Sequence, residues 1–123
     1  MASQETNIFN EIRIAVSAMG ARLFRNHTGM VKDERGRVHR FGLCKGSSDG
    51  IGWVSVVITP EMVGKQLAVF TAIEAKTPTG RASKEQKNFI EQVSNAGGIA
   101  GIARSGIDST KLIDDYLKKL LDI

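Results

Sequence analysis

The stretch that decides the fold is LAVFTAIEAK, residues 67–76. Seven largely apolar residues are followed by Glu74, Ala75 and Lys76. In a β-strand, side chains at i and i+2 share a face and lie about 6–7 Å apart, so Glu74 and Lys76 point together while Ala75 points into the packing on the other face. The sequence therefore predicts a buried strand that ends in a carboxylate beside an ammonium group.

A second carboxylate, Asp49, lies in the glycine-rich stretch GSSDGIG, residues 46–52. Asp49 and Glu74 together could hold a hard divalent cation that keeps most of its waters, and the Ala75 carbonyl between the two strand-end side chains is a further candidate ligand. Lys76 would orient or deprotonate the attacking water. Because a divalent ion supplies a hydroxide near neutral pH and neutralises the transition state, this set indicates a metal-dependent phosphodiesterase site.

The size and composition of the chain limit what can surround this site. With 123 residues and 41% hydrophobic content, we expect one compact domain over residues 1–123 and no separate DNA-reading module. Cys44 is the single cysteine, so a disulfide framework or a zinc cluster is not expected. No signal peptide or membrane span is evident, and we expect a soluble, cytoplasmic protein with no membrane partner.

Basic residues gather immediately before the Asp49 loop. The chain carries a formal net charge of +4, and between residues 22 and 45 only Asp33 and Glu34 offset seven cations, which are Arg22, Arg25, Lys32, Arg35, Arg37, Arg40 and Lys45. A polyanion is the natural partner of such a segment. A merely solvated hairpin is the alternative, but the direct continuation into the Asp49 loop favours binding.

The periods of the apolar residues predict an α/β chain in the order α-β-β-β-α-β-α. The expected elements are a helix over residues 8–19, a strand over 22–27, an exposed hairpin tip or a mobile loop over 32–37, a strand over 53–59 that pairs with the strand over 67–76, a helix from Ser83 to the Gly97-Gly98 stop, a strand over 99–103 and a last helix from Asp108 onward. Residues 60–64 break the paired strands, and residues 77–80 form a turn.

These motifs occur in an order that resembles the VRR-NUC family of the PD-(D/E)XK nuclease superfamily. They are a first helix with an early Glu, a Gly-x-x-Asp loop, a Glu-x-Lys strand end, a Pro-x-Gly-Arg-x-Ser turn and a Gln in the next helix. The resemblance runs from about Glu5 to Arg104 and is closest to the short, stand-alone phage and bacterial members. It implies a restriction-endonuclease-like core, in which helices flank a central mixed β-sheet. It also implies a nuclease that uses Mg²⁺ or Mn²⁺ and no organic cofactor, and a homodimer that cleaves branched DNA such as Holliday junctions in a bacterial or phage-infected cell.

Matching the motifs to this chain assigns the site residues. The resemblance implies four catalytic positions, which are Asp49, Glu74, Lys76 and Gln86. For the acid of the first helix, Glu5 and Glu11 are both available. At about 100° per residue, Glu5 falls near the edge of the apolar stripe centred on Ile12, whereas Glu11 points well away from it. We therefore choose Glu5 as the fifth catalytic residue and keep Glu11 in reserve.

Expected DNA contacts come from the basic segment, the Asp49 loop and the turn after the Glu-x-Lys strand. They are Arg25, Asn26, Arg35, Arg37, Arg40, Lys45, Ser48 and Arg81. In the sequence Ala103-Arg104-Ser105 we see at most a remnant of the family's Val-Arg-Arg signature, a difference that bears on DNA contacts more than on catalysis.

Each motif also has a purely structural explanation. Glu74 and Lys76 could form an ordinary ion pair on a strand, Asp49-Gly50 could be a common turn pair, and Gln86 could simply complete a capping box with Ser83. The alternative function is a non-catalytic DNA-binding or scaffold protein that retains the nuclease fold. Loss of one of the motif residues would mark that alternative, and none is lost here.

Overall fold

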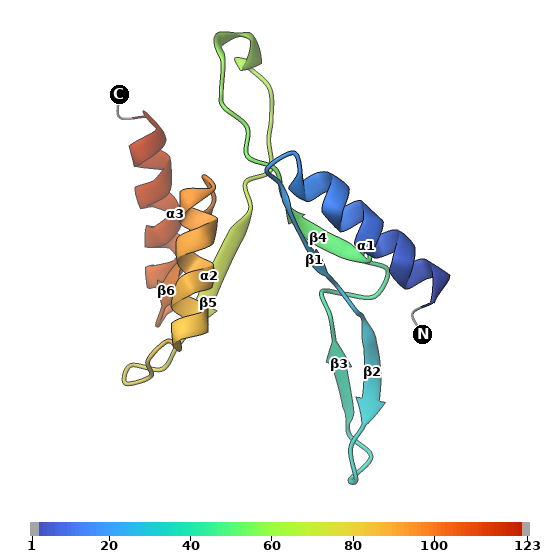
Figure 1. The fold of residues 1–123 in the computed structure, drawn as a ribbon. Helices are drawn as coiled ribbons and strands as arrows, with labels where there is room; N and C mark the ends of the chain where they lie inside the picture. Colours follow the sequence, from blue (N-terminus) through green and yellow to red (C-terminus); the bar gives the residue numbers. More distant parts are fainter. Residues whose placement is uncertain (1–2, 122–123) are drawn as a thin grey trace. The chain divides into compact units, whose positions relative to one another are not determined.

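The computed structural model describes residues 3–121 (Figure 1). Its residues group into two units, Met1–Val56 and Val57–Ile123, which we describe one at a time. Within the described residues, three helices and three two-stranded sheets give a mixed α/β chain, as the sequence predicts. A single central sheet and one domain over residues 1–123 stay predictions.

The first unit is built on helix α1 (Gln4–Ser17). Ser3 caps it by accepting a hydrogen bond from the Thr6 N–H, which satisfies one of the free amides of the first turn. The helix itself is as predicted, but Phe9 is the side chain that it buries, at 7% exposure, while Ile12 in the predicted stripe is 45% exposed. Counted from Phe9, Glu5 lies one turn earlier on nearly the same side, so the choice of Glu5 over Glu11 is kept.

Helix α1 packs on strand β1 (Arg22–Arg25), which pairs antiparallel with β4 (Gly50–Trp53). The register joins Arg22 to Trp53 and Arg25 to Gly50. The pairing needs glycine at position 52, because a Cβ there would lie 1.8 Å from the Arg22 carbonyl oxygen. This close approach therefore fixes β4 beside β1.

The other ladder of this unit is the hairpin of β2 (Gly29–Lys32) and β3 (Val38–Phe41). Asp33 closes its tip: Oδ1 accepts from the N–H groups of Arg35 and Arg37, each at 2.9 Å. The hydrogen bond from His39, followed by that of the Arg37 amide, lowers the pKa of Asp33 below its ordinary value of 3.8. The predicted exposed hairpin tip is thus confirmed.

The second unit is a βαβ arrangement with one added helix (Figure 1). Strand β5 (Thr71–Ala75) runs parallel to β6 (Ile99–Ala103), helix α2 (Lys84–Asn95) connects them and packs on both, and α3 (Gly106–Leu121) packs on β6. Val93 of α2 is the most deeply buried side chain, at 1% exposure, and Ile99 and Ala103 join it in the core. The Tyr116 hydroxyl donates to the Gly97 carbonyl at 2.7 Å and ties α3 to the end of α2.

The predicted strand over residues 53–59 is wrong. The strand is β4, which ends at Trp53, and its partner is β1. Residues 54–70 form no strand and contain only the short 3-10 helix η1 (Pro60–Met62), while β5 pairs with β6 instead of with residues 53–59. β-branched residues favour strands, but the ladder partner decides where a strand forms, and here Gly52 lets β1 take that place.

Candidate functional site

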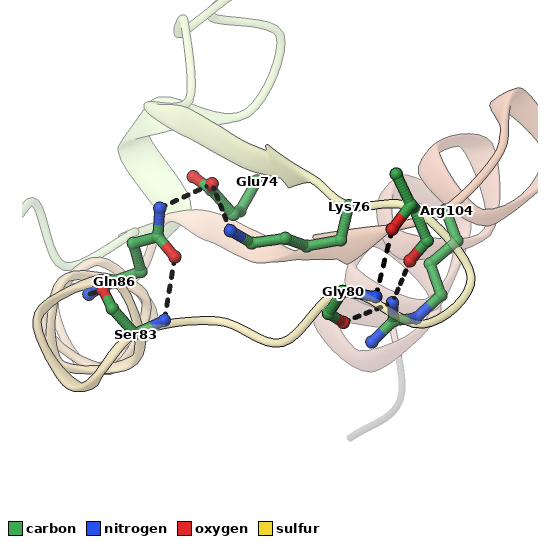
Figure 2. A network of polar contacts seen from close by, with 7 residues as sticks. Glu74, Lys76, Gly80, Ser83, Gln86 and Arg104 are labelled. Atoms are coloured by element: carbon green, nitrogen blue, oxygen red, sulfur yellow. Dashed lines mark hydrogen bonds and ion pairs between the residues drawn. The ribbon is translucent and has the colours of Figure 1, made fainter.

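Glu74, Lys76 and Gln86 come together at the end of β5 (Figure 2). The Lys76 Nζ lies 3.4 Å from Glu74 Oε1, and the Gln86 Nε2 donates to the same oxygen at 2.8 Å. The two charged side chains are partly covered, with relative exposures of 33% for Glu74 and 20% for Lys76. Partial covering and the hydrogen bond from Gln86 distinguish this cluster from a fully exposed ion pair.

Gln86 holds this position because it also caps α2. Its Oε1 accepts from the Ser83 N–H at 2.9 Å, and the Ser83 Oγ accepts from the Gln86 N–H at 3.1 Å, which is a complete capping box. The amide oxygen therefore serves the helix, and the amide nitrogen serves Glu74. The capping role of Gln86 is confirmed, and a functional role stays a prediction that the cap does not prevent, because the contact with Glu74 uses a different atom of the side chain.

The end of β5 offers oxygen ligands of the kind that Mg²⁺ and Mn²⁺ prefer. Both contacts of the Glu74 carboxylate fall on Oε1, and within the described part of its own unit, residues 57–121, no hydrogen bond or ion pair is formed by Oε2. The Lys76 N–H donates to the Ala103 carbonyl at 3.1 Å. Because backbone groups alternate along a strand, the Ala75 carbonyl points away from β6. One carboxylate oxygen and one carbonyl fit a cation that keeps several waters.

No cluster of three or more His, Cys, Asp or Glu side chains forms within the described residues, so these oxygens do not belong to a complete protein cage. The Ala75 side chain is exposed and does not point into the packing as the sequence suggested. A ligand role for Ala75 stays a prediction and concerns its backbone carbonyl only.

Arg104 braces the turn that follows the site (Figure 2). Its Nη1 donates to the carbonyls of Thr77, at 2.5 Å, and Gly80, at 2.8 Å, while its backbone N–H donates to Asp108 Oδ2 at 2.9 Å. Because parallel strands end at the same edge of a sheet, the residue after β6 lies beside the residues after β5. The signal in the sequence that could have indicated this role is the position of Arg104 directly after the strand over residues 99–103.

A pocket of about 330 Å³ lies between β5 and α2 and borders the site. It is lined by Ala72, Ile73, Glu74, Glu85, Gln86, Phe89 and Ile90. Glu74 and Gln86 thus lie at the edge of a mostly apolar hollow. The face of β5 beside the Glu74 carboxylate is therefore accessible through this pocket.

Asp49 lies in the first unit, in a loop that Asn26 organises. The Asn26 N–H donates to the Asp49 carbonyl at 2.7 Å, and its Nδ2 donates to Ser47 Oγ at 2.7 Å and to the Ser48 carbonyl at 2.8 Å. Its Oδ1 accepts from the Leu43 N–H at 2.9 Å. The Asp49 side chain is exposed. Sequence reasoning assigned Asn26 to DNA, whereas in this structure its side chain shapes the loop that carries Asp49.

The other predicted site residues are exposed on their units, except for Arg25, which is half-buried. Glu5 is exposed on α1, and Arg25 is placed with its guanidinium carbon 4.5 Å from the centre of the Phe9 ring. The remaining predicted DNA contacts are all exposed: Arg35, Arg37, Arg40, Lys45, Ser48 and Arg81. The structure thus brings together Glu74, Lys76 and Gln86, while roles for Asp49, Glu5 and the DNA contacts stay predictions.

Comparison with known proteins supplies the family. The model of the VRR-NUC domain matches residues 16–106, which include the Asp49 loop, the β5 cluster and Arg104 but neither Glu5 nor Glu11. No curated protein and no solved structure matches the chain. The match covers more than half of the 123 residues and contains the three side chains that meet at the end of β5, and the chain therefore belongs to the VRR-NUC family.

Proposed function

We propose that this protein is a metal-dependent, structure-selective endonuclease that hydrolyses phosphodiester bonds in branched DNA such as Holliday junctions. Family membership indicates a nuclease domain that acts on DNA. The observation that carries the proposal is the contact of one carboxylate oxygen of Glu74 with both Lys76 and Gln86, which leaves the other oxygen for a cation.

The cluster divides the chemistry among its residues. A Mg²⁺ or Mn²⁺ ion, when bound, would supply an acidified water and neutralise charge on the phosphate. Glu74 Oε2 and the Ala75 carbonyl would hold the ion. Lys76 would orient the attacking water through its ammonium group, which lies beside the carboxylate, or would take the proton of that water when its amine is neutral. Gln86 would keep Glu74 in one rotamer.

Asp49 completes the ligand set in this proposal, and Glu5 holds an outer-sphere water or a second ion. Support for Asp49 is its exposure at the end of a loop that several Asn26 hydrogen bonds fix. Support for Glu5 is weaker and rests on its side of α1. Replacing Asp49 with Asn should therefore impair cleavage more than replacing Glu5 with Gln.

The substrate class follows from charge and assembly. The formal charge of +4 and the exposed cations of the first unit favour a polyanion. A symmetric homodimer would set two sites at a fixed separation, which explains how a small domain could select a branched substrate. The segment after β4 offers apolar surface for such an interface, since Val57, Ile58 and Val63 are 84%, 65% and 86% exposed.

The direct experiment measures cleavage of four-way, flap, splayed and linear duplex DNA with Mg²⁺, with Mn²⁺ or with EDTA. We expect cleavage of branched DNA only with metal, and we expect Glu74→Gln to abolish it. The matched control is Glu91→Gln, an exposed acid on α2, which should cleave like the wild type. Tight binding to junctions without cleavage under every metal condition would support the non-catalytic alternative instead.

Sedimentation equilibrium at micromolar concentration tests the assembly. A species of twice 13.3 kDa is expected. A protein that stays monomeric while it resolves four-way junctions would show that symmetric dimerisation is not the source of selectivity.

A further inference from the structure

The β2–β3 hairpin is an exposed two-stranded ribbon whose two faces can be assigned from its register. All eight strand residues are exposed, and Met30 pairs with Arg40 and Lys32 with Val38. Residues directly opposite each other in an antiparallel pair share a face, and alternate residues along each strand share it too. One face therefore carries Met30, Lys32, Val38 and Arg40, and we call it the Lys32 face.

The opposite face is neutralised and partly covered. It carries Val31 opposite His39, and Phe41 lies across Gly29, where a Cβ would meet the Phe41 ring at 2.5 Å. At the tip, Asp33 Oδ2 lies 3.0 Å from the Arg37 Nε and 2.9 Å from the His39 Nε2. Asp33 thus compensates the charge of Arg37, which lies on this face.

The Lys32 face has no such partner. Neither Lys32 nor Arg40 forms an ion pair with any described residue of its own unit, residues 3–56, and the same holds for Arg35 at the tip. Lys32 and Arg40 are diagonal neighbours across the ladder, about 7–8 Å apart at their Cα atoms. That separation is about twice the axial rise of 3.4 Å per phosphate of one DNA strand. Two uncompensated cations at this spacing complement a nucleic-acid backbone.

We infer that the Lys32 face is the surface of the ribbon that contacts DNA phosphates, through Lys32 and Arg40, and that Arg37 is a structural cation of the turn. This inference rests on the proposed function in taking DNA as the ligand. The inference assigns different roles to Arg37 and Arg40, although they lie three residues apart and carry the same charge. A two-stranded ribbon is also an element that the major groove of duplex DNA can admit.

The test measures DNA affinity against salt concentration in EDTA, so that binding is read without cleavage. Arg40→Gln and Arg37→Gln are matched, because each removes one charge from the same ribbon by the same substitution. Each lost phosphate contact should reduce the slope of log affinity against log salt by about 0.9. We expect this reduction for Arg40→Gln and Lys32→Gln and an unchanged slope for Arg37→Gln. Between 50 and 200 mM salt, the affinity of a variant that has lost one contact should therefore fall about 3.5-fold less than the affinity of the wild type.

Arg40→Lys guards against a trivial loss of folding, because it should restore the wild-type slope. Equal slopes for the Arg37 and Arg40 variants, or an Arg40→Gln slope equal to that of the wild type, would overturn the inference. Failure of the proposed function looks different. A protein that never cleaves but shows the predicted slopes would refute the nuclease and leave the binding face standing. Normal cleavage with the same salt slope for variants of both faces would support the nuclease and refute the binding face.

Discussion

Replacing Gln86 with Ala separates the two roles that this side chain combines. The variant loses the acceptor for the Ser83 N–H and the donor to Glu74 Oε1. The first loss removes half of a capping box on the surface of the unit, which should cost about 0.5–1 kcal/mol of stability. The second removes a hydrogen bond to a charged group, worth about 1.5–3 kcal/mol. Because Glu74 is one-third exposed, we take the lower end, about 1.5 kcal/mol.

If the contact with Glu74 holds the carboxylate in its reactive position, about 1.5 kcal/mol should appear in the barrier and slow cleavage roughly tenfold. Ser83→Ala is the informative comparison. It removes the other half of the capping box, at about 1 kcal/mol of stability, but leaves the Gln86 amide beside Glu74. Gln86→Ala should therefore be the slower nuclease, and it should also be the less stable variant, because it loses both hydrogen bonds.

Urea unfolding and single-turnover cleavage at saturating Mg²⁺ give the two quantities for each variant. Asn88→Ala, an exposed amide on the same helix, is the control and should change neither. If Gln86→Ala cleaves like the wild type, or if the two capping-box variants slow cleavage equally, Gln86 acts only as a cap and the reasoning about its amide fails.

Other predictions follow from single contacts. Lys76→Ala should abolish cleavage while DNA affinity in EDTA and urea stability change little, since a partly exposed ion pair contributes about 0–1 kcal/mol; Lys87→Ala on α2 is the control, and residual turnover above a few per cent would argue against the role of Lys76. Arg104→Ala should lower stability by about 1 kcal/mol in urea unfolding and slow cleavage, because the turn after the site loses its brace; normal cleavage would limit Arg104 to a structural role. The folded-state pKa of Asp33 is depressed, so its contribution to the hairpin is present above 3.8 and is lost as the pH falls through the lower folded value. Hydrogen exchange of the Arg35 amide should accelerate over that acidic range relative to amides of α2, and an unchanged ratio would contradict the proposed Asp33 turn.

Much of the local structure could be predicted because neighbouring residues control it. Ser83 and Gln86 lie three residues apart and make a capping box in any helix that begins there. Gly97, with a φ of 101°, ends α2 where the sequence predicts the stop, since glycine adopts this conformation without steric cost. The pairing of β1 with β4 and of β5 with β6 could not be predicted in the same way. Propensity favours a strand over residues 53–59, but a ladder also needs a partner whose backbone can approach closely.

The sequence by itself determined the family motifs, the helices and the adjacency of Glu74 and Lys76, because a period of two residues along a strand sets that adjacency. Only the tertiary structure decided that the Gln86 amide reaches Glu74, that Arg104 braces the turn after β5, and that Asp33 compensates Arg37 but not Arg40. Each of these contacts depends on the register of a ladder or on the packing of a helix against a strand. Hydrogen bonds and ion pairs act over about 3–4 Å, and only the folded chain brings residues that are distant in sequence within such distances. For the same reason, two cations that look alike in the sequence can have different partners in the structure.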